Sequence, residues 1–441
     1  MNTLEFKQTL ELNNDYEVIV VGGGPSGCTA AAAAAREGAK TLLVEATGAL
    51  GGMGTSGLVP AWCPFTDYEK LIYRGMAEKV LKAGIAGMPH VNNDHFNWTP
   101  IDPELLKRIY DDLVTENGAE VLFSSMLSAV KTDGQGSVES IVIANKAGLT
   151  AYKADVYIDC SGDADLAVWA GAEYEQGDET GDLQPATHCF MLANVDDYAY
   201  IYGEGLHRAN PKSPIHAICA EGKYPLIPDT HSCNSQILPG VVGFNAGHIW
   251  DVDNTKPKTV SNALIQGRKI AYAFEQALAE YYPKAYANAK LVATGSLMGI
   301  RETRRVIGDY YLTAEELMAF KSFDDEICRN AYYIDVHHRK SEIGGKHEGG
   351  DGFRFPQGKS HGLPYRCLTP KGIKNVLIAG RSISTDRPTQ GSTRVMPVCL
   401  AMGEAVGIAA KMAARENNGD VHAVNTDTLR DKLKEHGAYL P

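Results

Sequence analysis

Glu17-Val-Ile-Val-Val21-Gly22-Gly-Gly24-Pro-Ser-Gly27 is the stretch that decides the fold of this 441-residue chain. The β-branched run before the glycines predicts a buried parallel strand. The alanine-rich segment after them predicts a helix from about Pro25 to Glu37, which Gly38 ends. Thr41-Leu-Leu-Val-Glu45 predicts a second strand. Together these elements predict a β-α-β unit with a right-handed crossover.

The glycines fit the pattern G-x-G-x-x-G of a dinucleotide-binding turn. Gly22 makes the tight turn, Gly24 lets the backbone approach a pyrophosphate, and Gly27 lets the helix pack on the strand. The phosphates then lie at a helix N-terminus, where free N–H groups and the helix dipole favour negative charge. Glu45 ends the next strand, where a carboxylate accepts both ribose hydroxyls and repels a 2′-phosphate. This fingerprint by itself fits NAD and FAD equally.

Further segments distinguish the two cofactors. The acidic strand end is followed by Gly48-Ala-Leu-Gly-Gly-Met-Gly-Thr-Ser-Gly57, and later segments are Ile158-Asp-Cys-Ser-Gly-Asp163, Met298-Gly-Ile-Arg-Glu-Thr-Arg-Arg305, Asn375-Val-Leu-Ile-Ala-Gly-Arg-Ser382 and Gln390-Gly-Ser-Thr-Arg-Val-Met-Pro397. In combination they resemble the FAD-dependent oxidoreductase family of the glutathione-reductase/fumarate-reductase flavoprotein superfamily. The resemblance implies FAD, with the 48–57 segment along the pyrophosphate and ribityl chain. It also implies that the C-terminal helix directs its N-terminus at the flavin, where its dipole stabilises negative charge.

The resemblance implies an α/β fold in which a Rossmann-like FAD-binding domain is discontinuous and an α+β substrate domain is inserted into it. We expect the FAD domain over 16–60, 101–185 and 365–415, the substrate domain over 186–364, an irregular insertion over 61–100 and a C-terminal extension over 416–441. The residues expected to contact FAD are Gly22, Gly24, Pro25, Ser26, Gly27, Glu45, Ala46, Gly51, Gly52, Met53, Gly54, Thr55, Leu127, Ser161, Gly162, Asp163, Gly380, Arg381, Arg394, Val395 and Met396.

The sequence contains no second G-x-G-x-x-G for a pyridine nucleotide. Gly240-Val-Val-Gly-Phe-Asn-Ala-Gly247 is rich in glycine but lacks the spacing. We therefore expect the fumarate-reductase type of arrangement, with one FAD and a substrate domain over it. Residues 48–57 contain no histidine, so a covalent flavin tether at that place is not expected.

Three residues are candidates for catalysis: Arg301, His337 and His338. An arginine can clamp a carboxylate or polarise a carbonyl, and the alternative for Arg301 is a structural ion pair with Glu302 or another acid. A histidine near neutral pKa can act as a general base, and the alternative is a hydrogen-bonded structural side chain. Tyr332–His338 reads as a strand, in which Asp335 shares a face with His337, and this favours His337 over His338.

Composition restricts the remaining function classes. A net charge of -12 argues against sequence-independent nucleic-acid binding. The nine scattered cysteines include no Cys-x-x-Cys pair, so we expect reduced thiols and no metal site. No uninterrupted apolar stretch is long enough for a membrane span, and the N-terminus lacks the pattern of a signal peptide, so we expect a cytoplasmic protein.

The predicted function is FAD-dependent oxidation or reduction of a small polar metabolite, either a hydroxylated compound or an organic acid. Hydride would pass to or from flavin N5. The alternatives are an FAD subunit that passes electrons to a partner protein and a non-catalytic FAD-binding protein, because a fold alone does not prove activity. A homo-oligomer is compatible with the sequence.

Overall fold

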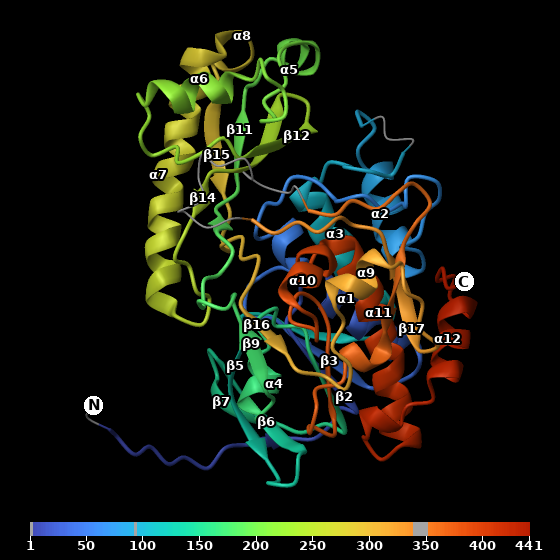
Figure 1. Ribbon diagram of the computed structural model, residues 1–441. Helices are drawn as coiled ribbons and strands as arrows, with labels where there is room; N and C mark the ends of the chain where they lie inside the picture. Colours follow the sequence, from blue (N-terminus) through green and yellow to red (C-terminus); the bar gives the residue numbers. More distant parts are fainter. Residues whose placement is uncertain (1–2, 92–94, 338–351) are drawn as a thin grey trace.

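A computed structural model describes residues 3–91, 95–337 and 352–441 (Figure 1). Its centre is a five-stranded sheet in which every neighbouring pair is parallel. In spatial order the strands are β19 (Val376–Ile378), β8 (Val156–Asp159), β2 (Val18–Val21), β3 (Thr41–Val44) and β4 (Glu120–Leu122). All residues of β2 and β3 are buried, as expected for parallel strands covered on both faces.

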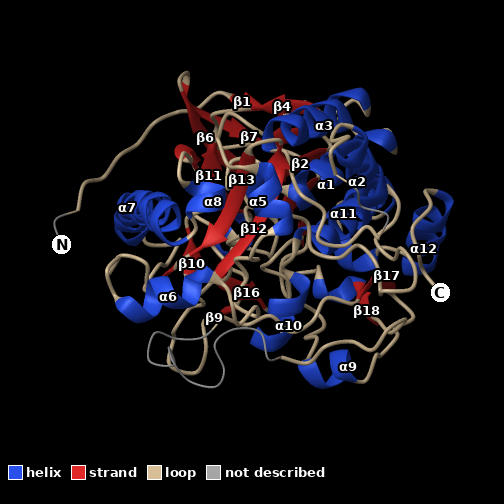
Figure 2. Ribbon diagram, turned by 90° about the horizontal axis from the view of Figure 1, so that it is seen from above, coloured by secondary structure: helices blue, strands red, loops and turns tan. Residues whose placement is uncertain are grey.

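The helices are distributed over the whole chain. Their bounds are α1 (Pro25–Arg36), α2 (Met76–Ala86), α3 (Pro103–Glu116), α4 (Asp165–Trp169), α5 (Asp197–Tyr202), α6 (Pro214–Glu221), α7 (Pro257–Tyr281), α8 (Pro283–Tyr286), α9 (Ala314–Met318), α10 (Arg387–Thr393), α11 (Met396–Glu416) and α12 (Thr426–Glu435). Figure 2 shows α7 on the side of the molecule opposite α2 and α12.

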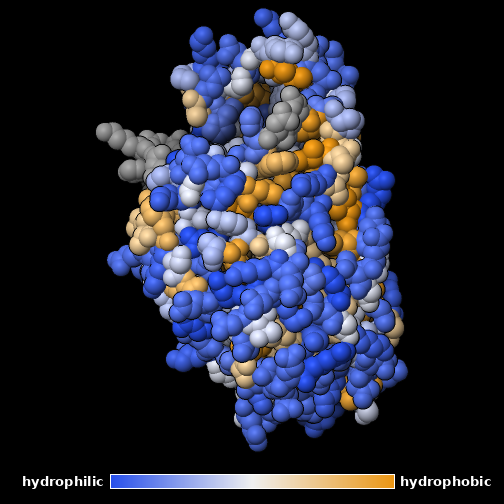
Figure 3. Space-filling view, turned by 90° about the vertical axis from the view of Figure 1, so that its right-hand side faces the viewer, coloured by the Kyte–Doolittle hydropathy of each residue, from blue (hydrophilic) through white to orange (hydrophobic). Residues whose placement is uncertain are grey.

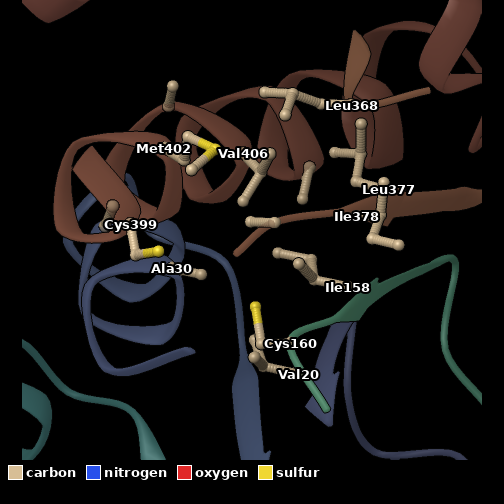
Figure 4. Packing of buried hydrophobic residues seen from close by; sticks show 14 of the residues in the cluster. Val20, Ala30, Ile158, Cys160, Leu368, Leu377, Ile378, Cys399, Met402 and Val406 are labelled. Atoms are coloured by element: carbon tan, nitrogen blue, oxygen red, sulfur yellow. The ribbon is translucent and has the colours of Figure 1, made fainter. Parts of the chain in front are cut away.

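Helices α1 and α11 cross at very short range beside the central sheet. A Cβ atom on Gly403 would lie 2.1 Å from the Ser26 carbonyl oxygen, and one on Gly407 would lie 2.3 Å from the Ala30 carbonyl oxygen. Figure 4 shows the resulting core, with Met402 and Val406 of α11 facing side chains of the sheet. Helix α11 is long and apolar enough to cross a membrane, but 89% of its apolar window is buried inside the protein. Helix α11 is therefore a buried core helix.

A second, four-stranded sheet packs on the same core and has the order β1 (Leu12–Asn13), β7 (Gly148–Tyr152), β6 (Val138–Asn145) and β5 (Met126–Thr132). Two short pairs join later segments. They are β9 (Tyr174–Gln176) with β16 (Arg304–Val306), and β17 (Glu326–Asn330) with β18 (His361–Pro364).

A separate unit is inserted between β9 and β16. Its antiparallel sheet has the order β12 (Ser232–Leu238), β13 (Val241–Ala246), β11 (Phe190–Ala193) and β15 (Lys290–Thr294), and β10 (Ala186–Thr187) pairs with β14 (His248–Ile249) beside it. Phe274 of α7 packs on Phe190 with ring centroids 5.5 Å apart, so α7 covers one face of this sheet. Figure 3 shows apolar residues gathered in the upper half of one face of the molecule, the half that holds this unit in Figure 1.

The unit has its own hydrophobic core, which runs from Ala186 to Ile300. The inserted domain expected over 186–364 contains this core, but its residues after 305, such as Val306, Leu317 and Leu363, pack in the first core. The α/β fold class, with a parallel Rossmann-like sheet and an inserted α+β unit, is confirmed.

Several local predictions are wrong for identifiable reasons. The pattern over residues 151–158 predicts one strand, but this run is divided between β7 and β8 of different sheets, because the backbone N–H groups of Lys153 and Asp155 donate to the carbonyls of Asn13 and Glu17. Residues 332–337 form no strand. The side-chain oxygens of Asn330 and Gln184 accept hydrogen bonds from the backbone N–H groups of Tyr332 and His337, respectively. In a sheet, a neighbouring strand would accept these hydrogen bonds. Helix α10 and strand β5 were not predicted.

Candidate functional site

The predicted cofactor segments meet at one edge of the central sheet. Because β2, β3, β8 and β19 are parallel, their carboxyl ends deliver Gly22, Glu45, Ser161 and Gly380 to the same edge. In open α/β sheets, ligands bind outside the carboxyl ends of the strands. The tertiary structure therefore assembles one site from segments that are hundreds of residues apart.

The glycine turn is shaped by backbone contacts. Gly22 has φ +99°, and a Cβ there would lie 2.4 Å from the Cys160 carbonyl oxygen. A Cβ on Gly27 would lie 1.8 Å from the Gly22 carbonyl oxygen, whereas one on Gly24 would meet nothing within 4 Å. Gly24 is also the N-cap of α1, which has no side-chain cap and no acidic residue in its first turn. The α1 N-terminus with the open space at Gly24 fits a pyrophosphate.

Glu45 is held rigidly beside this turn. Its Oε2 accepts a hydrogen bond from the Gly23 N–H at 2.7 Å, and its Oε1 accepts one from the Thr47 N–H at 2.7 Å. The side chain is nearly buried, and the neighbouring Ala46 is exposed. Each carboxylate oxygen keeps a second lone pair, which is the acceptor capacity that a ribose diol needs.

The segment over 51–55 leads from the turn to the N-terminus of α11. Gly51 and Gly52 have φ +98° and +51°, and a Cβ on Gly54 would lie 3.2 Å from the Met396 sulfur. The Thr55 hydroxyl is fully buried and donates to the Leu50 carbonyl at 2.6 Å, so this hydroxyl fixes the shape of the loop. Met53 lies in the same turn, and Leu127 is buried in β5.

An ion pair and a hydrogen bond connect the segments that follow β8 and β19. Asp163 accepts hydrogen bonds from Arg381 at 2.7 Å, from Thr303 at 2.5 Å and from Asn254. The Gly162 carbonyl accepts one from Ser382 at 2.6 Å. Asp163 and Arg381 thus link the sheet edge to the inserted unit.

Helix α11 begins beside this edge without a capping side chain. Val395 is its N-cap, and no acidic residue lies in its first turn. Arg394, which precedes it, donates to the carbonyl and to the carboxylate of Asp335 at 2.9 and 3.0 Å. A free helix N-terminus at this place fits a group that gains negative charge on reduction.

Arg301 is a nearly buried cation that contacts neutral oxygens. Its Nη1 donates to the Pro185 carbonyl at 2.6 Å and to the Thr187 hydroxyl at 2.9 Å, and its Nη2 lies 3.5 Å from the Asn245 side-chain oxygen. Among the residues that the structure describes, no carboxylate lies within 4.0 Å of the guanidinium. Burial, followed by the positive charge of Arg394, lowers the pKa of Arg301 to about 10.

The alternative for Arg301, an ion pair with Glu302, is not formed between these two described residues. Glu302 pairs instead with Arg305 at 2.6 Å and with Arg387 at 3.0 Å. Arg304 pairs with Asp165. The side chains of Arg301, Arg304 and Arg305 therefore point in different directions, and the side chain of Arg301 contacts the inserted unit.

His337 lies in a buried cluster with two histidines of the inserted unit. Its Nδ1 is 2.8 Å from Nε2 of His248, whose Nδ1 is 2.7 Å from the Asp229 carboxylate. Its Nε2 is 3.5 Å from Asp335. The positive charge of Arg301 acts on both His337 and Asp335. His338, the other candidate, lies outside the described residues.

The electrostatics of the cluster keep His337 neutral. Burial, followed by the charge of Arg301, lowers the pKa of His337 well below its ordinary value. Burial alone would raise the pKa of Asp335, but its neighbours His337, Arg394 and Arg301 lower it overall. The site thus pairs a neutral imidazole with an ionised carboxylate at neutral pH.

The three histidines do not have the orientation of a metal site. His231, His248 and His337 each place a ring nitrogen within 4.8 Å of the others. The rings of His231 and His248 are stacked, however, with centroids 4.2 Å apart and an interplanar angle of 17°. A metal ion binds along the in-plane lone pair of an imidazole, and two nearly parallel rings cannot both direct that lone pair at one ion.

Sequence reasoning missed His231, His248 and Asp229. They lie in the region before α7, where no motif was found, and 17 or more positions separate His248 from the other two. The only signal in the sequence was the abundance of histidine in that region. Pairing of β12 with β13 brings His231 beside His248 of the short β14, and His248 contacts His337.

Comparison with known proteins assigns the family. The model of the FAD dependent oxidoreductase family matches residues 17–433. A 47-residue stretch is 53% identical to dihydrolipoyl dehydrogenase of Trypanosoma brucei brucei, and it covers 11% of this chain and 10% of that protein. The chain therefore matches about a tenth of the length of this curated relative.

Solved structures align over almost the whole chain at low identity. A geranylgeranyl bacteriochlorophyll reductase-like protein from Thermoplasma acidophilum is 14% identical, with a TM-score of 0.48 and coverage of 98% of this chain and 93% of that one. L-proline dehydrogenase from P. horikoshii is 12% identical, with a TM-score of 0.44 and coverage of 97% and 100%. Because the family model spans nearly all of the chain, this protein belongs to the FAD-dependent oxidoreductase family and is an enzyme whose cofactor is FAD.

Proposed function

We propose that this enzyme oxidises or reduces a small polar metabolite, either a hydroxylated compound or an organic acid, at a site formed by Arg301 and His337. The observation that carries the proposal is the nearly buried guanidinium of Arg301, which has no described carboxylate within 4.0 Å. A buried charge without a counterion is costly, and an anionic or carbonyl group of a substrate would compensate it.

The residues proposed to hold FAD are those at the sheet edge. The α1 N-terminus at Gly24 to Gly27 would bind the pyrophosphate, and Glu45 would accept the adenosine ribose hydroxyls. The segment from Gly51 to Thr55 would follow the ribityl chain, and the α11 N-terminus would face the flavin ring. Bound there, FAD supplies a hydride acceptor or donor at N5.

Arg301 and His337 would have separate roles in binding the substrate and accepting its proton. Arg301 can hold a carboxylate or polarise a carbonyl with its unused donors. His337, neutral at pH 7 because of its lowered pKa, can take the proton of a substrate hydroxyl. The inserted unit would cover the site and exclude water from it.

Anaerobic mixing of the holoenzyme with a panel of hydroxy acids, sugars and their acids tests this proposal. We expect at least one member to bleach the flavin absorbance directly and in a saturable way. A flavin that is reduced only when a partner protein is added would identify an electron-transferring subunit instead. A flavin that no member of the panel and no partner reduces would identify a non-catalytic FAD-binding protein.

NADH and NADPH should reduce the flavin poorly. The chain lacks a second G-x-G-x-x-G, which is the turn that usually binds a nicotinamide nucleotide. Stopped-flow mixing of the holoenzyme with each nucleotide measures this directly. Rapid, saturable bleaching by either would contradict the prediction.

Glu45→Ala should weaken FAD binding by about 1.5–3 kcal/mol, the range for a hydrogen bond to a charged group. The substitution removes the ribose acceptor and also releases the N–H groups of Gly23 and Thr47. Glu17→Ala is a matched control, because Glu17 pairs with Arg415 at the protein surface. Equal retention of FAD by wild type and Glu45→Ala during dialysis would contradict the assignment.

A further inference from the structure

A continuous row of hydrogen-bonding groups runs from the candidate base into the inserted unit. His337 Nδ1 lies 2.8 Å from His248 Nε2, and His248 Nδ1 lies 2.7 Å from Asp229. Both histidines are nearly buried. These contacts connect His337, which follows β17 in the chain, to His248 and Asp229 of the inserted unit. They therefore run between the two hydrophobic cores.

The contacts fix the proton positions when both rings are neutral. A neutral imidazole carries one N–H and one bare nitrogen. His248 must give its Nδ1–H to the Asp229 carboxylate, so its Nε2 is bare and accepts a hydrogen bond. His337 must then donate through Nδ1–H, which leaves its Nε2 bare. The ring nitrogen of His337 that can take a proton is therefore Nε2, the one 3.5 Å from Asp335.

The surroundings favour a positive charge at His248 over one at His337. Arg301 is the main neighbour that opposes a charge on His337. For His248, burial also lowers the pKa, but the hydrogen bond and the charge of Asp229 are the leading neighbour effects and raise it. After His337 accepts a proton, the positive charge is therefore more stable on His248, next to Asp229, than on His337.

We propose that Asp229 and His248 form a proton relay behind His337, an inference that rests on the proposed oxidation of a hydroxylated substrate. The substrate O–H proton bonds to His337 Nε2 while the proton on His337 Nδ1 passes to His248 Nε2. The substrate C–H bond breaks with its electron pair going to FAD, so the substrate becomes a carbonyl compound and FAD is reduced. The proton is left on His248, paired with Asp229.

In this relay His248 and Asp229 are positioning residues, because they act through His337. His231 stacks on His248 at 4.2 Å and contributes packing. Among the described residues, the charged and titratable groups that act on the two relay rings are Asp229, His231, Asp335, Arg208 and Arg301, and Arg394 acts on Asp335. Asp229 and Asp335 stabilise a proton in the relay, and Arg208 and Arg301 oppose it.

Nitrogen-15 NMR of the FAD-loaded, full-length protein with labelled histidines tests the relay without any substrate. At pH 7 we expect both His248 and His337 to be protonated at Nδ1 and bare at Nε2. As the pH falls, His248 should be the first of the two to carry protons on both nitrogens. This measurement on wild type needs no variant that must fold.

Asp229→Asn should lower the midpoint of the His248 titration by about one pH unit or more, which is a tenfold loss of proton affinity. The sign follows because the carboxylate stabilises the charged ring. His231→Asn, which removes the stacked ring but no hydrogen bond of the relay, should leave both tautomers unchanged. His337 protonated at Nε2, or an unchanged midpoint in Asp229→Asn, would overturn the relay.

Two other outcomes separate the relay from competing ideas. A metal ion bound stoichiometrically in the purified holoenzyme, and lost in His248→Gln, would overturn the relay because the same nitrogens would be ligands. The expected tautomers, together with a panel of hydroxy acids and sugars that fails to bleach the flavin, would support the relay while contradicting the proposed substrate class.

Discussion

Gly27→Ala should yield protein that retains no FAD through purification. The added methyl group would lie 1.8 Å from the Gly22 carbonyl oxygen, so the start of α1 must move away from the turn that it continues. Overpacking of this kind costs about 1–3 kcal/mol, and the movement also displaces the N–H groups that would bind the pyrophosphate. We expect FAD affinity to fall by more than about 100-fold, or about 2.7 kcal/mol. Flavin absorbance and thermal unfolding of the apoprotein measure the two effects separately.

Gly24→Ala is the matched variant that separates fold from ligand. A Cβ at Gly24 would meet no protein atom within 4 Å, so the apoprotein should unfold at nearly the wild-type temperature. FAD affinity should still fall, because the methyl group enters the space assigned to the pyrophosphate. Gly84→Ala is the control, because Gly84 lies in helix α2 and a Cβ there would also meet nothing within 4 Å. This substitution should lower neither the unfolding temperature nor the FAD affinity. FAD binding by Gly24→Ala that matches wild type would refute the pyrophosphate assignment.

Arg301→Ala and His337→Ala should each keep FAD and slow flavin reduction by substrate by about 10²-fold or more, the usual loss for a positioned acid–base group. Arg301 is expected to hold an anionic or carbonyl group, and His337 to remove a proton. Arg301→Lys should recover little, because lysine lacks the planar fork of donors. The measurement is the rate of anaerobic flavin bleaching with a compound identified from the panel.

Arg268→Ala is the control for loss of one positive charge, because Arg268 is exposed on α7 of the same inserted unit. It should reduce the flavin at the wild-type rate. Wild-type rates in both Arg301→Ala and His337→Ala would contradict the assignment. A holoenzyme structure with both side chains more than about 10 Å from N5, beyond the reach of a bound small molecule, would contradict it as well.

The sequence was sufficient for the parts that depend on local pattern. The run Glu17–Val21, the glycines to Gly27 and the acidic end of the next strand specify a β-α-β unit, because strand burial, turn geometry and helix start are all short-range. The resemblance of dispersed segments added FAD and the family, and both are confirmed by the family match over residues 17–433.

Tertiary structure decided what depends on contacts between distant segments. Sequence patterning placed Asp335 and His337 on one face of a strand that does not form, and they still lie 3.5 Å apart. His248 and Asp229 gave no local signal, since a hydrogen bond across 89 residues leaves no periodicity in the chain. The sequence by itself thus determined the cofactor-binding fold. The histidine row forms only where the inserted unit meets that fold, and burial there is the main cause of the lowered pKa values of Arg301 and His337.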